Sequence, residues 1–213
     1  MARVDEPVYH RPMPARAAAT HNAHNTRRGA AAPQSARERI LQTAHDLFSL
    51  EGIRATGIDR VIAESGVTKV TLYRHYPSKN ELILAFLDYR HERWMAWFDA
   101  ALRRFGDDAA ALAPALAEWF AHPQFRGCAF INTVAELGPA LPQAIERAQT
   151  HKRAMQARIA ALLPAGPARE TRARALAVAV DGAIVRAACD GDASDALDAL
   201  RCMVAATMAK KPR

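Results

Sequence analysis

The fold is decided by residues 55–82, which read ATGIDRVIAESGVTKVTLYRHYPSKNEL. This stretch holds two short helical segments, Gly57–Glu64 and Lys69–His75, and Gly66 between them can supply the backbone turn. The apolar residues placed to hold the two helices together are Val61, Val67 and Leu72. The spacing therefore predicts a helix-turn-helix whose second helix keeps an exposed polar face.

That exposed face carries side chains suited to reading DNA, namely Lys69, Thr71, Tyr73 and Arg74. A helix of this size fits the major groove, about 12 Å wide, where Arg or Lys can pair with guanine and the Thr methyl group can meet that of thymine. His75 and Lys79 stand beside helix termini and suit contacts to phosphate. On spacing alone, any helical hairpin with a glycine turn and solvated charges shows the same pattern.

The run from Ala55 to Leu82 resembles the DNA-binding domain of the tetracycline-repressor-like (TetR) transcriptional regulators, most specifically in TLYRHYPSK, residues 71–79. One position departs from the family pattern: Ile62 stands where the family often has a small residue, so the two helices are expected to pack slightly further apart. The resemblance implies base contacts from Lys69, Val70, Thr71, Tyr73 and Arg74, phosphate contacts from His75 and Lys79, and a DNA-binding set that includes the capping residue Thr68.

The composition of the chain is that of an all-α protein. Of its 213 residues, 48 are alanine, and no alternating run argues for a sheet. Capping boxes at residues 35–38, 56–59 and 78–81 predict three helix starts, the last opening a helix of about 28 residues and about 42 Å. Further helices are expected at about 109–121, 127–137, 141–163, 167–189 and 193–209. The prediction is about nine helices: an N-terminal three-helix domain with the helix-turn-helix, and a C-terminal helical domain for ligand binding and dimerisation.

Three regions follow from this pattern. Residues 1–34, with four prolines and few large apolar groups, are expected to be a disordered basic leader. The alternative is that the translation start has been placed too far upstream and that Met13 is a later start. Such a segment could also contact DNA as a flexible arm. Residues 35–82 are expected to form the DNA-binding domain and 83–213 the effector-binding and dimerisation domain.

The net charge of +7 makes a polyanionic partner plausible, and the positive excess is concentrated before residue 81. No segment has the roughly 20 apolar residues of a membrane-spanning helix or the apolar block of a secretion signal, so a cytoplasmic protein without a membrane partner is expected. The three cysteines, Cys128, Cys189 and Cys202, match no disulfide or zinc spacing and are expected to be small buried hydrophobes.

The helix that follows Ser78 leads from the DNA contacts into an aromatic-rich region, so it could act as a lever. Residues 119–136 resemble one regulatory-domain subgroup of the TetR family, which implies architecture and no particular ligand. A mostly apolar effector pocket is expected there, and packing in an ordinary core is the alternative for the same residues. The predicted pocket residues are Trp94, Trp97, Phe98, Trp119, Phe120, Phe130 and Met155, with Asn132, Glu136 and His151 to orient the ligand.

The family fold implies that the last two helices pair with their copies in a four-helix dimer interface. Small and apolar residues recur along both helices and would permit close approach. An ordinary core stripe within one chain is the alternative. The predicted interface residues are Ala173, Leu176, Ala177, Val180, Ala183, Ile184 and Ala187, with Leu197, Leu200, Val204 and Met208 opposite them.

Catalytic signatures are missing from the sequence, which has no serine-hydrolase elbow, phosphate loop, zinc-protease motif or dinucleotide fingerprint. Residues 190–201 begin like a calcium loop, but Asp195 and Arg201 stand where Gly and Glu are needed. We therefore expect no enzyme, cofactor or metal. The expected function is that of a homodimeric repressor, which binds a palindromic double-stranded operator and is relieved by an unknown small-molecule effector. The alternative is a DNA-binding protein that is not ligand-responsive, or one that is basic and sequence-indifferent.

Overall fold

The computed structural model describes residues 34–209, and within that range it is helical with no β-strand, as the sequence predicts. Apart from Gln34, the leader expected at residues 1–34 lies outside the described residues. The α-helices are α1 (Ala36–Glu51), α2 (Ile58–Ser65), α3 (Lys69–His75), α4 (Lys79–Arg104), α5 (Leu112–Phe120), α6 (Ala129–Leu137), α7 (Pro142–Ala161), α8 (Arg169–Asp190) and α9 (Ser194–Met208), with 3-10 turns η1 (Ala109–Ala111) and η2 (Gly138–Ala140).

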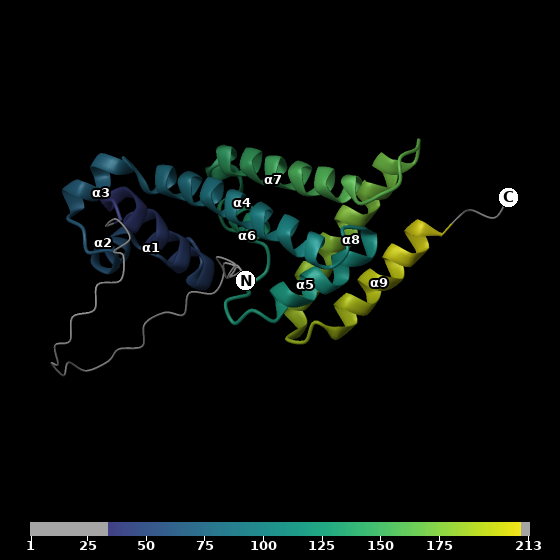
Figure 1. Cartoon of the computed structure of the whole chain (residues 1–213). Coiled ribbons are helices and arrows are strands. Elements are labelled where there is room, and N and C mark those ends of the chain that lie inside the picture. Colours follow the sequence, from purple (N-terminus) through teal and green to yellow (C-terminus); the bar gives the residue numbers. More distant parts are fainter. Residues whose placement is uncertain (1–33, 210–213) are drawn as a thin grey trace, which may run out of the picture.

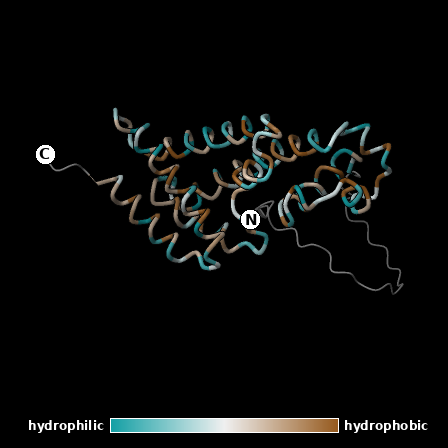
Figure 2. Tube along the Cα trace, turned by 180° about the vertical axis from the view of Figure 1, so that it is seen from behind, coloured by the Kyte–Doolittle hydropathy of each residue, from teal (hydrophilic) through white to brown (hydrophobic). Residues whose placement is uncertain are grey.

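The helices form an elongated arrangement in which α1, α2 and α3 gather at one end (Figure 1). Helix α4 runs from that end alongside α7 toward α5, α8 and α9 at the other. Hydrophobic and hydrophilic residues alternate along the helices (Figure 2), which is typical of amphipathic helices that bury one side. Helix α4 therefore connects the helix-turn-helix to the C-terminal helices.

The starts of the helices test the predicted capping boxes. At α1, Ser35 and Glu38 exchange both hydrogen bonds of a capping box, which confirms that prediction and lowers the pKa of Glu38. At α4, the Ser78 hydroxyl accepts the Glu81 N–H at 3.1 Å. The box predicted at residues 56–59 is wrong, because Thr56 is buried and its hydroxyl donates to the carbonyl of Gly52 at 2.8 Å, which leaves α2 without a side-chain cap.

One continuous core joins the two ends of the molecule. Ile40 of α1, Val61 of α2 and Leu72 of α3 are fully buried, and so is Leu82 at the start of α4. Along α4 the same core continues through aromatic side chains into the C-terminal helices. At 26 residues α4 is slightly shorter than predicted, about 39 Å, because it ends at Arg104.

The cysteine prediction holds for one residue of three. Cys128 is buried, whereas Cys189 on α8 and Cys202 on α9 are exposed in the single chain. The expectation that all three are buried hydrophobes is therefore wrong for the last two, because both point away from the core that α8 and α9 share.

Candidate nucleic-acid interface

The helix-turn-helix is built as its sequence predicts. Gly66, between α2 and α3, adopts the left-handed conformation with φ 65° and ψ 31°, which an L side chain rarely adopts. Val61 and Leu72 are fully buried and hold α2 and α3 against α1. Ile62, the departure from the family pattern, is partly buried and packs against the same core. The second helix is thereby fixed with one side free.

The free side of α3 presents the predicted reading residues to solvent. Lys69 and Arg74 are exposed, Val70 is 68% exposed and Tyr73 is 40% exposed. Val70 is thus far more exposed than Leu72, the buried residue that anchors this seven-residue helix. This side of α3 therefore carries two cationic side chains, one aliphatic side chain and one aromatic ring, all of which a DNA groove could contact.

Thr68 and Thr71 have a structural task at the start of α3. The Thr68 hydroxyl accepts the Thr71 N–H at 3.2 Å and lies 2.9 Å from the Thr71 hydroxyl. Thr68 is exposed and Thr71 is half-buried. The cap therefore fixes the orientation of Thr71 at the start of α3.

The two residues predicted to contact phosphate differ in their surroundings. His75, in the last turn of α3, is half-buried. The Lys79 ammonium donates to the carbonyl of Ile53 at 2.7 Å, and burial lowers the pKa of Lys79, an effect that the nearby Glu136 carboxylate opposes. A phosphate contact from Lys79 would have to share or replace this bond, and both residues stay predictions.

The residues predicted to line one effector pocket line two neighbouring spaces, which share Arg90 and Ala129. The aromatic group packs closely: the Phe130 and His151 rings stack at 3.9 Å between centroids, and Trp94 and Phe98 at 4.6 Å. The space left beside them, next to Met155, is about 10 Å³, room for one water at most. The aromatic members that fill this core region are Trp94, Trp97, Phe98, Trp119, Phe120 and Phe130.

Asn132 and Glu136 lie elsewhere, on a side of α6 that faces the end of α1. The Asn132 amide donates to the carbonyl of Arg126 at 2.9 Å, and the Glu136 carboxylate accepts the Arg54 N–H at 2.9 Å. Both residues line a cleft of about 150 Å³ between α1, α4 and the segment that ends in α6. The structure thus separates the predicted aromatic residues from two of their polar partners.

This cleft contains Arg90, a residue that the sequence reasoning missed. Arg90 is only 9% exposed, although it is charged. The signal was present, because Arg90 stands four residues after Phe86 and four before Trp94, on the apolar stripe of α4. A cation on such a stripe indicates either a buried ion pair or a ligand-binding site.

The predicted dimer residues need a correction. All of the predicted α8 and α9 residues except Met208 are buried within the single chain, where α8 and α9 pack on each other and α8 packs on α7. The stripe that the sequence shows is therefore the core stripe of one subunit and is not available to a partner. The correction covers Ala173, Leu176, Ala177, Val180, Ala183, Ile184, Ala187, Leu197, Leu200 and Val204.

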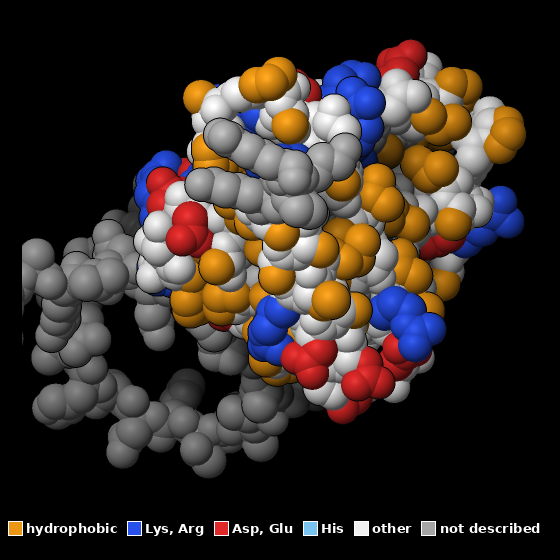
Figure 3. Space-filling view, turned by 90° about the vertical axis from the view of Figure 1, so that its right-hand side faces the viewer, with side chains coloured by type: hydrophobic (Ala, Val, Ile, Leu, Met, Phe, Trp, Pro, Cys, Tyr) orange, Lys and Arg blue, Asp and Glu red, His pale blue; other side chains and the backbone are white. Residues whose placement is uncertain are grey.

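The outward face of the same two helices carries a different set of small and apolar residues. Val178 is 67% exposed, Val185 43% and Met203 47%. Figure 3 shows that hydrophobic side chains also gather at the end of the molecule that it faces. We call the following exposed residues the outer α8–α9 face: Ala175, Val178, Gly182, Val185, Cys189, Ala199, Cys202, Met203 and Ala206.

Two further classes of site are absent from residues 34–209. No three His, Cys, Asp or Glu side chains come together there as a metal site would require. None of the helices in that range combines the length and hydrophobicity needed to span a bilayer. The features that stand out are the exposed side of α3, the cleft and the outer α8–α9 face.

Comparisons with known proteins agree with this geometry. Residues 40–86 match the model of the bacterial regulatory proteins of the tetR family. SCO4454, a TetR-family transcriptional regulator from Streptomyces coelicolor, is 32% identical, and its structure matches 83% of this chain and 89% of its own with a TM-score of 0.72. A TetR transcriptional regulator from Chloroflexus aurantiacus is 25% identical over 80% of this chain and 92% of its own, with a TM-score of 0.67.

Curated relatives match over shorter stretches. The HTH-type transcriptional regulator YxaF of Bacillus subtilis is 44% identical over 54 residues, 25% of this chain and 28% of that protein. The HTH-type transcriptional activator FasR of Mycolicibacterium smegmatis is 33% identical over 99 residues, 46% of this chain and 45% of that protein. The chain thus spans less than half of the length of these relatives. From the match to SCO4454, which covers 89% of that protein, the chain belongs to the TetR family of DNA-binding transcriptional regulators, which are not enzymes.

Proposed function

We propose that this regulator binds a palindromic operator as a homodimer and acts as a repressor whose operator affinity falls when a small-molecule effector binds. In this proposal, residues 35–82 form the DNA-binding domain and residues 83–213 the domain for effector binding and dimerisation. The observation that carries it is the exposed side of α3, held rigidly by buried Leu72 and by the turn at Gly66.

The chemistry of α3 supports direct reading of base edges in the major groove. The Arg74 guanidinium can donate two hydrogen bonds to guanine, and the Lys69 ammonium can contact guanine in the same way. The exposed Val70 and the Thr71 methyl group suit the methyl group of thymine, and Tyr73 offers both a ring and a hydroxyl. Thr68, His75 and Lys79 would then position the helix on the backbone.

The outer α8–α9 face supports a dimer. Its exposed valine and methionine side chains would be removed from water by a second copy, and Ala175 and Gly182 would let the helices approach closely. A two-fold axis through this face would present two copies of α3 to DNA. Palindromic half-sites one helical turn apart, about 34 Å, are the expected target.

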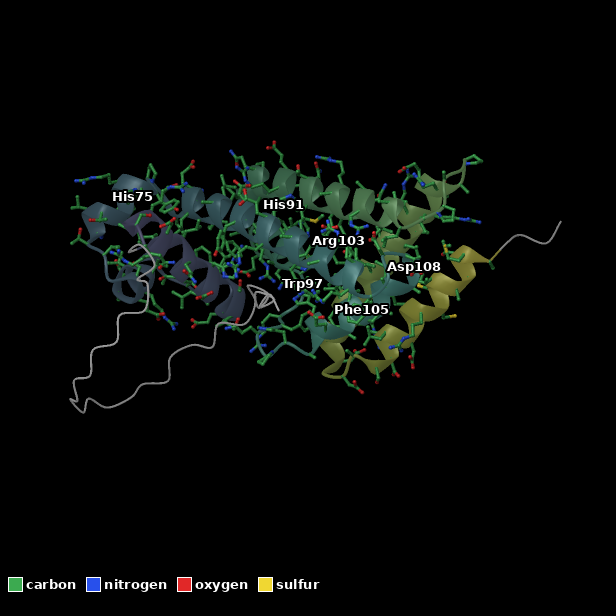
Figure 4. The ribbon with its side chains drawn as sticks, viewed as in Figure 1. His75, His91, Trp97, Arg103, Phe105 and Asp108 are labelled. Carbon is green, nitrogen blue, oxygen red and sulfur yellow. The ribbon has the colours of Figure 1, made fainter. Side chains whose placement is uncertain are left out.

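The continuity of α4 supports a link between ligand and operator. His75 lies at the DNA-reading end of the molecule, His91 is midway along α4, and Arg103 and Phe105 are at its far end (Figure 4). An effector that binds better to a state with a different orientation of α4 would move the two reading helices out of register. Such differential binding lowers operator affinity.

The experiment is selection of bound duplexes from a random library by the full-length protein at fixed salt. We expect an enriched palindrome that binds about 10³-fold or more tightly than random duplex. Equal affinity for both duplexes would favour the sequence-indifferent basic protein instead, and enrichment of a single half-site would contradict the dimer.

The sign of regulation is tested on the selected site. FasR is named an activator, so activation is the second candidate for this chain. In transcription with purified polymerase from a promoter that overlaps the site, a repressor lowers the amount of transcript, and an increase would assign activation.

A further inference from the structure

The cleft between the two ends of the molecule has the size of a small ligand. Its volume of about 150 Å³ is comparable to that of engineered protein cavities that hold a benzene ring. Its walls come from the last turn of α1, the middle of α4, and the loop and helix of α6. Phe48, Ile53 and Phe86, all buried, make one side apolar. The aromatic cluster beside Trp94, by contrast, leaves no such space.

Positive charge lines the same cleft. Arg90 is buried at the cleft, with one guanidinium nitrogen 3.4 Å from His45 Nε2. Burial lowers the pKa of His45, a hydrogen bond with Asp46 opposes that effect, and the Arg90 charge adds to it. Arg126 lines the cleft as well and is held in place by the carbonyls of Pro123 and Phe125. Arg90 and Arg126 therefore both line this small space.

A hydroxyl group without a partner lies beside Arg90. The Ser49 oxygen is buried and has no hydrogen-bond partner among the described residues. Ser49 follows His45 by one helical turn, so it lies on the side of α1 that meets Arg90. A buried hydroxyl with no partner is uncommon and costs stability. An acceptor placed between Ser49 and Arg90 would accept a hydrogen bond from the Ser49 hydroxyl and would also pair with the Arg90 guanidinium.

The cleft also contains one carboxylate, which the backbone of the chain binds. Glu136 lines the cleft from α6, but one of its oxygens accepts the Arg54 N–H and its charge acts on Lys79. The cleft therefore has an apolar side, a cationic side and a carboxylate already engaged by the chain. Carboxylate ligands form strong paired hydrogen bonds with such guanidinium groups.

We propose that this cleft binds a small organic anion, with one carboxylate on an apolar body about the size of a benzene ring. The carboxylate would accept hydrogen bonds from Arg90 and Ser49, and the body would lie against Phe48, Ile53 and Phe86. Because α1 belongs to the DNA-reading end and α6 to the C-terminal helices, an occupant would also fix the angle between α1 and α6. The effect of this angle on operator binding rests on the proposed function, whereas binding of the anion to the cleft does not.

The test is calorimetric titration of the full-length protein, without DNA, with sodium benzoate as the probe and benzamide as its neutral match. We expect saturable binding of one benzoate per chain, with benzamide weaker by about tenfold or more because it lacks the charge. Arg90→Gln is expected to weaken benzoate binding by about tenfold, and Ser49→Ala by about threefold. Arg103→Gln, on the same helix but outside the cleft, is the matched control and should leave benzoate binding unchanged.

Several results would overturn the site. They are the absence of saturable benzoate binding, equal binding of benzamide, or an equal loss in Arg103→Gln. If circular dichroism shows that Arg90→Gln does not fold, the benzamide comparison and Ser49→Ala decide, since the Ser49 hydroxyl has no partner to lose. Operator affinity is measured separately. If the protein binds benzoate but selects no operator, only the proposed function is contradicted. If it selects an operator but does not bind benzoate, only the ligand site in the cleft is contradicted.

Discussion

The Glu136 carboxylate accepts a hydrogen bond from the backbone N–H of Arg54 at 2.9 Å, although the two residues are 82 positions apart in the chain. Glu136 is near the end of α6, and Arg54 lies in the loop between α1 and α2. Gly52 of that loop has φ 87°, and a Cβ there would lie 3.1 Å from a Glu136 oxygen. Lys79 holds the same loop through the Ile53 carbonyl. The base of the helix-turn-helix is thus tied to both α4 and α6.

Glu136→Ala should weaken this tie. Loss of a hydrogen bond from a backbone N–H to a charged acceptor is expected to lower the free energy of unfolding by about 1–2 kcal/mol. The measurement is urea denaturation, with Glu146→Ala, at an exposed position of α7, as the control. If both variants unfold at the same urea concentration as the parent, the contact does not hold the two parts together.

Much of the helix-turn-helix could be predicted from the sequence because its determinants are local. Gly66 is needed for a left-handed turn, Ser35 and Ser78 cap the helices that they precede, and Leu72 is the buried position of α3. Thr56 shows the limit of such reasoning. Its hydroxyl had a backbone carbonyl within reach at Gly52, and that bond replaced the predicted cap.

The C-terminal part was harder to predict because core and interface use the same residue types. The regular spacing of Leu176, Val180 and Ile184 identifies an apolar side of α8 but not which neighbour covers it. The structure assigns that side to the chain itself. The contact between Glu136 and Arg54, like the cleft near Arg90, depends on tertiary placement over many residues, which local patterns do not encode.

Arg74→Ala tests base reading by α3. If Arg74 pairs with a guanine, its loss should cost about 1–3 kcal/mol of operator binding and relax selection at one position of each half-site. Affinity is measured by fluorescence anisotropy on the selected operator and on single-base variants. Arg103→Ala, at the far end of α4, should leave operator affinity unchanged (Figure 4). Uniform weakening across all sequences would show instead that Arg74 contacts phosphate.

His151 should make the fold sensitive to acid. Burial, with smaller contributions from Lys152, His91 and Arg90, lowers the pKa of His151 to about 2 from 6.5. Below about pH 6.5 the unfolded chain gains a proton that the folded chain does not, so stability falls as the pH falls. The loss attributable to this residue is about 2 kcal/mol by pH 5.

Replacement of His151 by Phe, which can keep the stacking on Phe130, should remove that part of the acid sensitivity. Urea denaturation at pH 7 and pH 5 measures the difference, and His45 remains in both proteins as a second group with a lowered pKa. Parallel losses in the parent and in His151→Phe would show that His151 is not protonated on unfolding in this range.

The outer α8–α9 face can be tested by placing a charge on it. Val178→Glu and Met203→Glu replace exposed apolar side chains, so the single chain should stay folded, with little change in its unfolding by urea. In a dimer the same carboxylates would be buried against each other without partners, which is strongly unfavourable. Sedimentation velocity is therefore expected to show monomers, and operator affinity should fall because two linked reading helices are lost.

The control for this test is Gln143→Glu, which adds the same charge at an exposed position of α7. Leu176→Glu is the opposite case, since it would put a carboxylate into the core of the chain and unfold it rather than separate two folded copies. Circular dichroism distinguishes the two outcomes. The helical signal is expected to remain for Val178→Glu and to disappear for Leu176→Glu. A Val178→Glu protein that remains dimeric would place the subunit contact on another surface, and the exposed Val185 would then need a different explanation.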